Sequence, residues 1–202
     1  MANKEKTKRQ AQAIRRKDKL FATAVKLFYM YGYDSVTIEQ ICTEAGVSKG
    51  LFYNYFASKD EIFMIMFNEV EDVYRDIRAS FVPGETAMER LLDCTERIAL
   101  HVMSNELRYE SLRIVYIRTL KQETSMLTNQ DREFFLTMRE IIEYGQHRGE
   151  IRADLPMEQI LNYITSHLFG CYFLSVANDQ FDLLKEIKTH VSLIIKGIST
   201  KP

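Results

Sequence analysis

Apolar side chains recur at spacings of three and four residues along almost the whole chain, the pattern of amphipathic α-helices. No run of alternating β-branched residues indicates a strand, and glycine and proline are scarce, at 8 and 3 residues. The pattern predicts an all-α protein of about nine helices. Their approximate ranges are 15–31, 38–45, 48–55, 58–77, 86–103, 107–121, 125–147, 156–176 and 180–197.

Capping residues define several of these ends. Thr37 followed by Gln40, like Thr86 followed by Glu89, predicts a capping box at the start of a helix. Gly46 breaks the helix 38–45. The Pro-Gly turn at 83–84 is the clearest internal boundary, so we place a domain junction along the fourth helix and this turn.

Composition is that of a globular protein with a core of its own: 46% of the 202 residues are hydrophobic and 27% are charged. Three widely spaced cysteines form neither a disulfide framework nor a metal-binding pair. No signal peptide is visible, and the most apolar stretch, 164–177, is shorter than the ~20 residues that span a bilayer. We therefore expect a soluble, cytoplasmic protein that has no membrane partner.

The distribution of charge is more informative than its sum of −1. Residues 1–26 carry nine Lys/Arg against two acidic residues, whereas residues 63–202 carry 16 against 21. A basic end on a near-neutral chain indicates a polyanionic partner at that end alone. The first 14 residues are predicted to form a basic flexible arm, which either follows that partner or is merely solvated.

Residues 37–56 read TIEQICTEAGVSKGLFYNYF. Two short helices separated by a glycine are what a helix-turn-helix requires, because the second helix is then free to enter the DNA major groove. One face is predicted to pack against Leu27 and Phe28; it comprises Ile38, Ile41, Val47, Phe52 and Phe56. The other face offers a cation, a close-approach glycine, a phenol and an amide, on Lys49, Gly50, Tyr53 and Asn54.

These residues resemble the DNA-binding domain of the tetracycline-repressor (TetR) family. The resemblance covers roughly residues 15–65 and rests on Thr37, Ile38, Ile41, the run Ala45-Gly46-Val47-Ser48-Lys49-Gly50, Phe52, Tyr53, Tyr55, Phe56 and Lys59. It implies a three-helix DNA-binding domain at 15–62 and a helical effector-binding and dimerisation domain at 63–202. The chain length and its all-helical remainder also suit the family.

The resemblance assigns DNA contacts to individual positions. Thr37 would hold a phosphate at the start of its helix, and Lys59 would add another. Asn54 is the expected base-reading amide, and Leu51 either contacts a thymine methyl or packs. The full set of expected DNA contacts is Thr37, Ser48, Lys49, Gly50, Leu51, Tyr53, Asn54, Tyr55 and Lys59.

The last two predicted helices are apolar around most of their circumference, so each must bury two faces. One face can serve the chain's own domain, and the other either meets a second subunit or belongs to a thick monomeric core. The resemblance implies a two-fold homodimer, and hence a palindromic double-stranded operator. Its expected interface comprises Ile164, Leu168, Tyr172, Phe173, Leu184, Ile187, Val191, Ile194 and Ile195.

Aromatic and polarisable side chains on the predicted helices 86–103, 107–121 and 125–147 suit a small apolar or aromatic effector. The same pattern also describes an ordinary core. The candidate pocket residues are His101, Met103, Tyr109, Arg113, Tyr116, Phe134, Phe135, Met138, His167 and Tyr172.

No catalytic or metal-binding motif is present in the sequence, so we expect neither an enzyme nor a metal or other cofactor. The resulting hypothesis is a transcriptional repressor released from its operator by the effector. The alternatives are a regulator without a small-molecule effector and a helical carrier or enzyme that has lost DNA function.

Overall fold

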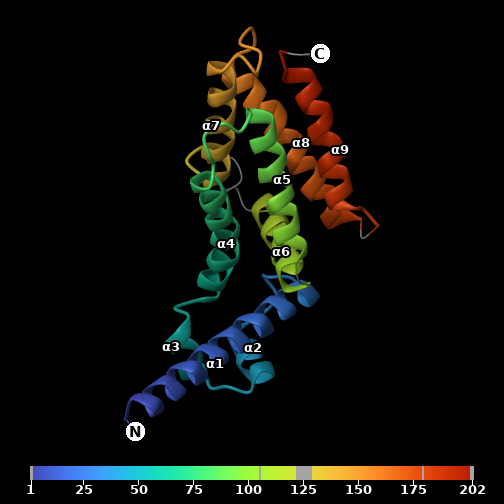
Figure 1. Ribbon diagram of the computed structural model, residues 1–202. Helices are drawn as coiled ribbons and strands as arrows, with labels where there is room; N and C mark the ends of the chain where they lie inside the picture. The colour runs from blue at the N-terminus through green and yellow to red at the C-terminus, as the bar shows by residue number, and fades with distance from the viewer. Residues whose placement is uncertain (1, 105, 122–128, 179, 201–202) are drawn as a thin grey trace. The chain divides into compact units, whose positions relative to one another are not determined.

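The computed structural model describes residues 2–104, 106–121, 129–178 and 180–200, with the backbone alone for 2–9, 106, 108, 116 and 119–121. Within these ranges the chain is all-α; the one β pairing there is an isolated bridge between Ile151 and Ser199. The elements are α1 (Ala2–Tyr31), α2 (Ile38–Ala45), α3 (Lys49–Tyr55), α4 (Lys59–Ala79), α5 (Ala87–Met103), α6 (Glu106–Lys121), α7 (Glu133–His147), α8 (Met157–Ala177) and α9 (Leu183–Ile198) (Figure 1).

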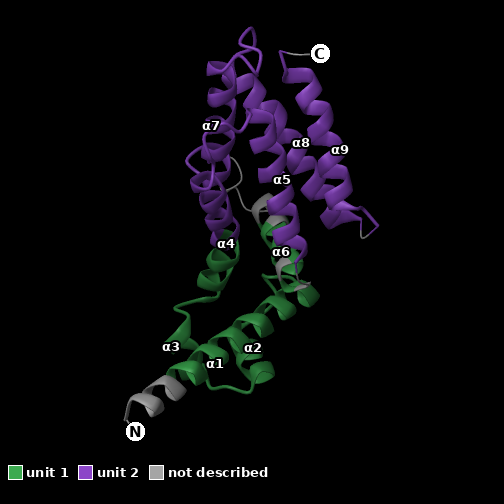
Figure 2. Ribbon diagram, viewed as in Figure 1, with its two compact units in different colours: residues 1–67, 105–121 green, residues 68–104, 122–202 purple. Residues whose placement is uncertain are grey.

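Two compact units divide the chain (Figure 2). Unit 1 contains residues 1–67 and 105–121, and unit 2 contains residues 68–104 and 122–202. The boundary lies inside α4, close to the predicted junction at residues 62–63. One assignment differs from the prediction: α6, expected in the C-terminal domain, packs against α1 in unit 1. Helical periodicity identifies an apolar face but does not identify the helix that covers it, so this pairing was not visible in the sequence.

Side chains from α1, α2, α3 and the start of α4 form the core of unit 1. Phe28 of α1, Ile41 of α2 and Phe52 of α3 are at most 1% exposed, and Phe56 and Ile62 are equally buried beside them. The rings of Phe52 and Phe56 lie 5.7 Å apart, which is ordinary aromatic packing. The predicted inward face of the helix-turn-helix is therefore confirmed at its large aromatic positions.

The start of α1 differs from the prediction. The helix begins at Ala2 rather than near Arg15, in place of the expected flexible arm. Residues 2–14 contain Ala, Lys, Gln, Arg and Glu, all good helix formers, and neither Gly nor Pro. The prediction followed the apolar stripe, and the first buried side chain of that stripe is Leu20.

Unit 2 is a bundle in which α5, α7, α8 and α9 run side by side (Figure 1). The helix α5 packs against α7 and α9, and α8 packs against the same two helices. Its core includes Ile98, Met138, Ile164 and Val191, all at most 1% exposed. The start of α7 was predicted near Ser125 but lies at Glu133, after a turn at 129–132; residues 125–128 are outside the described part.

The helix α8 is long and apolar enough, by length and composition, to cross a membrane. It begins at Met157, so it is longer than its most apolar stretch, 164–177. Half of its apolar window is buried inside the protein, with Ile160, Leu161 and Ile164 at most 1% exposed. Packing in the bundle therefore accounts for the buried half of this apolar surface.

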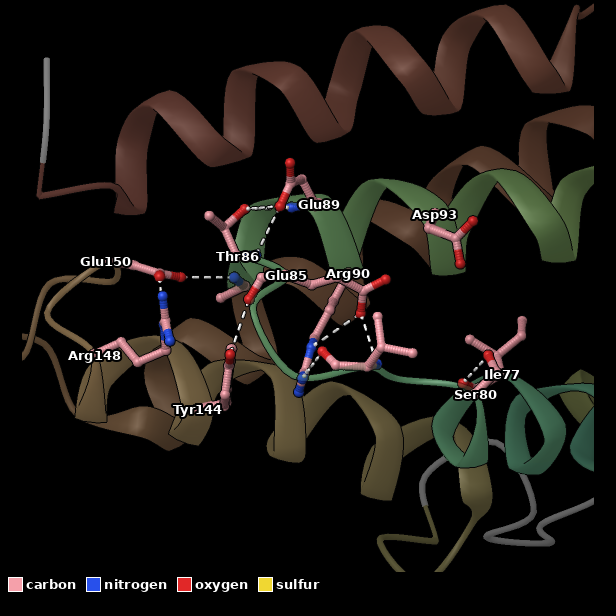
Figure 3. A network of polar contacts seen from close by, with 12 residues as sticks. Ile77, Ser80, Glu85, Thr86, Glu89, Arg90, Asp93, Tyr144, Arg148 and Glu150 are labelled. Atoms are coloured by element: carbon pink, nitrogen blue, oxygen red, sulfur yellow. Dashed lines mark hydrogen bonds and ion pairs between the residues drawn. The ribbon is translucent and has the colours of Figure 1, made fainter.

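A polar network fastens the turn between α4 and α5 to α7 (Figure 3). The guanidinium of Arg90 stacks on the rings of Phe81 and Tyr144, 4.7 and 3.8 Å from their centres. Its Nη2 donates to the carbonyl of Val82 (3.1 Å), and its Nε lies 3.6 Å from the Glu85 carboxylate. The Tyr144 hydroxyl donates to the Glu85 carbonyl (2.9 Å), so the turn is held from two helices.

Gly145 of α7 lies in close contact with α5 and with the chain after α7. A Cβ at this position would lie 2.6 Å from Ile151 side-chain atoms and 2.7 Å from the Ala87 Cβ. We expect Gly145→Ala to lower the free energy of unfolding by about 1–3 kcal/mol through overpacking, measured by urea denaturation. Gly197→Ala on α9 is the control, because no atom lies within 4 Å of its added Cβ. Equal stability of Gly145→Ala and the wild type would contradict the tight packing.

Candidate nucleic-acid interface

Local capping fixes the ends of α2 and α3. Thr37 is the N-cap of α2: its hydroxyl accepts from the Gln40 amide (3.2 Å), and the Gln40 side chain accepts from the Thr37 amide (2.7 Å). Gly46 ends the helix with a φ of 70°, a left-handed conformation that glycine adopts without strain. Ser48 caps α3 by accepting from the Leu51 amide (3.2 Å). The turn between the two helices is therefore set by residues within it.

The helix α3 has one buried and one exposed face. Phe52 is fully buried, whereas the neighbouring Tyr53 is 55% exposed and forms a T-shaped pair with the Phe52 ring, 5.5 Å between centres. The predicted contacts that lie exposed on or beside this helix are Thr37, Ser48, Lys49, Gly50, Tyr53 and Asn54. Leu51 and Tyr55 are half-buried. Most of the predicted DNA contacts are therefore exposed at the surface of unit 1.

Basic residues of α1 extend this surface. A depression of about 420 Å³ between α1 and the α2–α3 turn is lined by Arg16, Lys19, Ser48 and Leu51 among others. The Lys19 ammonium donates to the Ala45 carbonyl (3.0 Å), which attaches α1 to the end of α2. The place of these cations in the fold could not be predicted, because their neighbours are about 30 residues away in the chain.

The Lys49 ammonium is ion-paired with the carboxylate of Glu39 on α2, at 3.0 Å. Both side chains are mostly exposed, 55% for Lys49 and 72% for Glu39. An exposed pair of this kind contributes only about 0–1 kcal/mol, so Lys49 can exchange Glu39 for another anion at little cost.

Lys59 has a structural role that the sequence did not reveal. Its ammonium donates to the carbonyls of Tyr33 (2.8 Å) and Val36 (2.9 Å) and lies 4.3 Å from the centre of the Tyr33 ring. Burial lowers the pKa of this ammonium. Two of its three N–H donors are therefore occupied in joining the start of α4 to the loop before α2.

Asp60 lies next to Lys59 in the first turn of α4. Its carboxylate accepts from the Tyr33 hydroxyl (2.7 Å) and from Arg118 of α6 (2.5 Å), and these hydrogen bonds lower its pKa. The Arg118 guanidinium also lies over the rings of Tyr33 and Phe63, at 3.8 and 4.2 Å. The first turn of α4, four residues after the end of α3, is thereby fixed to the rest of unit 1.

Most of the predicted subunit contacts are not at the surface. Ile164, Leu168, Tyr172, Ile187, Val191 and Ile194 are at most 5% exposed and belong to the core of unit 2, which corrects the predicted interface. Phe173 is exposed, and Leu184 and Ile195 are half-buried. The apolar side chains that remain exposed on α8 and α9 are Tyr163, Phe173, Leu174 and Leu193. On each helix the buried side chains lie along a single face, so the predicted second buried face is not present within the chain. Periodicity could not tell which apolar face packs in the chain's own domain.

The predicted effector residues fall into both units. Tyr109 and Arg113 lie on α6 in unit 1, as does Tyr116, whose side chain is outside the described part. In unit 2, Phe134, Phe135, Met138 and Tyr172 are at most 5% exposed and form part of the core, while Met103 is 47% exposed. His101 faces Glu69, and His167 stacks on Tyr163. An effector pocket made of this set stays a prediction.

Known proteins share sequence with the region that contains α2 and α3. The family model for bacterial regulatory proteins of the tetR family matches residues 20–64. A relative in Aromatoleum sp. (strain CIB), the HTH-type transcriptional regulator HbdR, is 40% identical over 77 residues, 38% of this chain and 34% of that protein. The match thus spans about a third of HbdR. The HTH-type transcriptional repressor NicS of Pseudomonas putida is 29% identical over 175 residues, covering 82% of this chain and 78% of NicS.

Solved structures share the fold along most of the chain. SmeT, the repressor of a multidrug efflux pump of Stenotrophomonas maltophilia, has a TM-score of 0.75 at 14% identity, covering 92% of this chain and 91% of SmeT. A SmeT–triclosan complex has a TM-score of 0.78 at 14% identity, with 93% of each chain covered. The matched segment 20–64 contains the capped α2–turn–α3 unit and its exposed face. Residues 20–64 therefore match the tetR family of bacterial regulatory proteins, within a chain that shares its fold along most of its length with SmeT.

Proposed function

We propose that the protein is a sequence-specific DNA-binding transcriptional regulator that acts as a repressor. The exposed face of α3 and its N-cap carry the proposal: Ser48, Lys49, Tyr53 and Asn54 present a hydroxyl, a cation, a phenol and an amide, and all four residues are exposed. Such groups bind phosphates and base edges in the major groove. The repressor role is supported by relatives such as NicS, which is named a repressor.

Footprinting on the DNA upstream of the protein's own gene tests this function. We expect protection of a palindrome that survives excess random DNA and weakens as salt rises, because phosphate contacts release counterions. Binding without a protected site, followed by failure to select a specific sequence from random DNA, would contradict the proposal and favour a helical carrier or enzyme.

A two-fold dimer would place two copies of α3 in successive major grooves, about 34–36 Å apart. Its proposed interface is the exposed apolar patch Tyr163, Phe173, Leu174 and Leu193 on α8 and α9. Gly170 lies between the first two in sequence, and no atom lies within 4 Å of a Cβ built there, so a partner backbone has room to approach.

Phe173→Glu is expected to weaken self-association at least about tenfold, because it puts a charge into a desolvated apolar contact. Sedimentation velocity over a range of concentrations measures the change. Leu100→Glu on α5 adds the same charge at another exposed apolar position, 48% exposed, and serves as the control. A dimer as strong in Phe173→Glu as in the wild type would remove this patch from the interface.

Release by a small-molecule effector is the second part of the proposal. It is supported by the fold shared with SmeT, of which a complex with triclosan is known. The helix α4 runs unbroken from Lys59 to Ala79 and joins the two units. A shift of α4 that changes the spacing of the two recognition helices needs to favour the non-binding state by about 1–3 kcal/mol to give a 5–150-fold effect. A regulator without an effector would show no ligand-dependent shift in operator affinity.

The Glu39–Lys49 pair gives a prediction of its own. We expect Glu39→Gln to strengthen operator binding about 2–5-fold, since it removes a negative charge from the DNA-facing surface and releases the Lys49 ammonium. Fluorescence anisotropy at low salt measures the effect. Glu44→Gln removes the same charge from an exposed position on α2 and should give a smaller gain. Weaker binding of Glu39→Gln would show that the pair orients Lys49 for DNA.

A further inference from the structure

A cleft of about 210 Å³ lies between α6 and the C-terminal end of α1 with the loop after it. Three tyrosines line it, Tyr29, Tyr31 and Tyr33, together with Ile117 of α6. Tyr31 is 59% exposed and Ile117 is 47% exposed, so the cleft is open to solvent. Pockets for drug-sized ligands measure about 300–1,000 Å³, and this smaller cleft suits a single-ring molecule.

The charged groups of the cleft favour an anion. Arg113 and Arg118 line it, whereas Asp34 supplies its one carboxylate among the described lining residues. The Arg113 guanidinium lies 5.2 Å from the centre of the Tyr29 ring, so a cation is already placed beside an aromatic wall. An aromatic ligand that carries a carboxylate would meet both the rings and the cations.

Arg118 supplies a second, independent indication. Its side chain is 12% exposed, and its Nε and Nη1 have no hydrogen-bond acceptor among the residues that the structure describes. Buried donors without an acceptor are uncommon, because each has lost its water without replacement. An acceptor oxygen from a bound ligand would satisfy them.

We propose that the α1–α6 cleft binds a small aromatic molecule with an anionic group, and that its occupancy weakens operator binding. This inference rests on the proposed function and places the effector site in unit 1. Two residues of the cleft, Tyr33 and Arg118, also bind Asp60 in the first turn of α4. The Tyr33 hydroxyl donates to the Asp60 carboxylate at 2.7 Å, and Arg118 donates to it at 2.5 Å. A ligand anion that draws Arg118 from Asp60 loosens the first turn of α4, next to the recognition helix.

Calorimetric titration of the full-length protein with phenylacetate tests the site directly. Binding at one molecule per chain is expected, together with an operator affinity lowered at least about fivefold at saturation. The neutral aromatic 2-phenylethanol and the non-aromatic anion acetate should produce neither effect. Failure of phenylacetate to bind, or equal binding of 2-phenylethanol, would overturn the assignment to an aromatic anion.

Two variants locate the binding. Arg113→Gln removes a cation, and Ile117→Trp fills the cleft from an exposed position; both should lose the response to phenylacetate while they keep operator affinity and melting temperature. Arg97→Gln, an exposed arginine of α5 that pairs with Asp93, is the matched control and should keep the response. An unchanged response in both cleft variants, or a crystal structure with the acid in unit 2, would overturn the proposal.

The two proposals fail separately. A protein that binds phenylacetate through the cleft but recognises no operator would refute the proposed function and leave the ligand site standing. A protein that protects its operator but ignores phenylacetate would refute the ligand site alone.

Discussion

Tyr53→Ala is expected to weaken operator binding by about 100-fold or more and to leave the fold intact. The Tyr53 hydroxyl is placed on the exposed face of α3, where it can donate to a phosphate. A hydrogen bond to a charged group contributes about 1.5–3 kcal/mol, and a two-fold dimer loses it at both half-sites. The sum of about 3 kcal/mol or more corresponds to at least ~150-fold in Kd.

Fluorescence anisotropy with a labelled operator measures this loss, and the melting temperature shows whether the fold is intact. Leu100→Ala truncates another exposed side chain, in unit 2, and should leave affinity unchanged. Lys49→Ala is the companion variant, and its loss should shrink as salt rises, because it removes one phosphate contact. Unchanged affinity in both Tyr53→Ala and Lys49→Ala would show that α3 is not the recognition helix.

Phe52→Ala is expected to reduce stability, unlike Tyr53→Ala, which is expected to leave the fold intact. The free energy of unfolding should fall by about 3–5 kcal/mol. Phe52 is fully buried, and its ring contacts those of Phe56 and Tyr53 at 5.7 and 5.5 Å between centres. Its removal leaves a cavity at the centre of unit 1, against a total stability of about 5–15 kcal/mol for a typical domain. Chemical denaturation followed by circular dichroism measures the change.

The conservative variant Phe52→Leu keeps most of the buried volume and should recover most of the stability lost in Phe52→Ala. At a temperature where Phe52→Ala is still folded, its operator affinity should exceed that of Tyr53→Ala. If Phe52→Ala were as stable as the wild type, Phe52 would not be the anchor of α3, and the division of this helix into two faces would be wrong.

The ends of α2 and α3 were predictable because local chemistry fixes them. The Thr37–Gln40 box, the left-handed Gly46 and the Ser48 cap act within a few residues of each other. The same holds at α5, where the predicted box of Thr86 with Glu89 is present. The exposed face of α3 also followed from helical spacing alone, once Phe52 was assigned to the core.

Contacts between distant segments could not be predicted in the same way. The pairing of α6 with α1 and the use of Lys59 to bind the Tyr33 and Val36 carbonyls depend on folding that brings remote residues together. For Ile164 and Val191 the sequence showed that they are buried, but burial by a neighbouring helix and burial by a partner subunit leave the same apolar pattern.

The proposed recognition helix, α3, is only seven residues long, far below the ~12–15 residues at which an isolated helix becomes even marginally stable in water. Its shape is therefore maintained by the Ser48 cap and by Phe52 and Phe56, and neither phenylalanine needs to change when the outward residues do. Exchanges at Lys49 or Asn54 cost little in folding, because these side chains lie outside the core. Evolution can thus redirect this scaffold to new operator sequences by substitutions that leave the protein folded at every step.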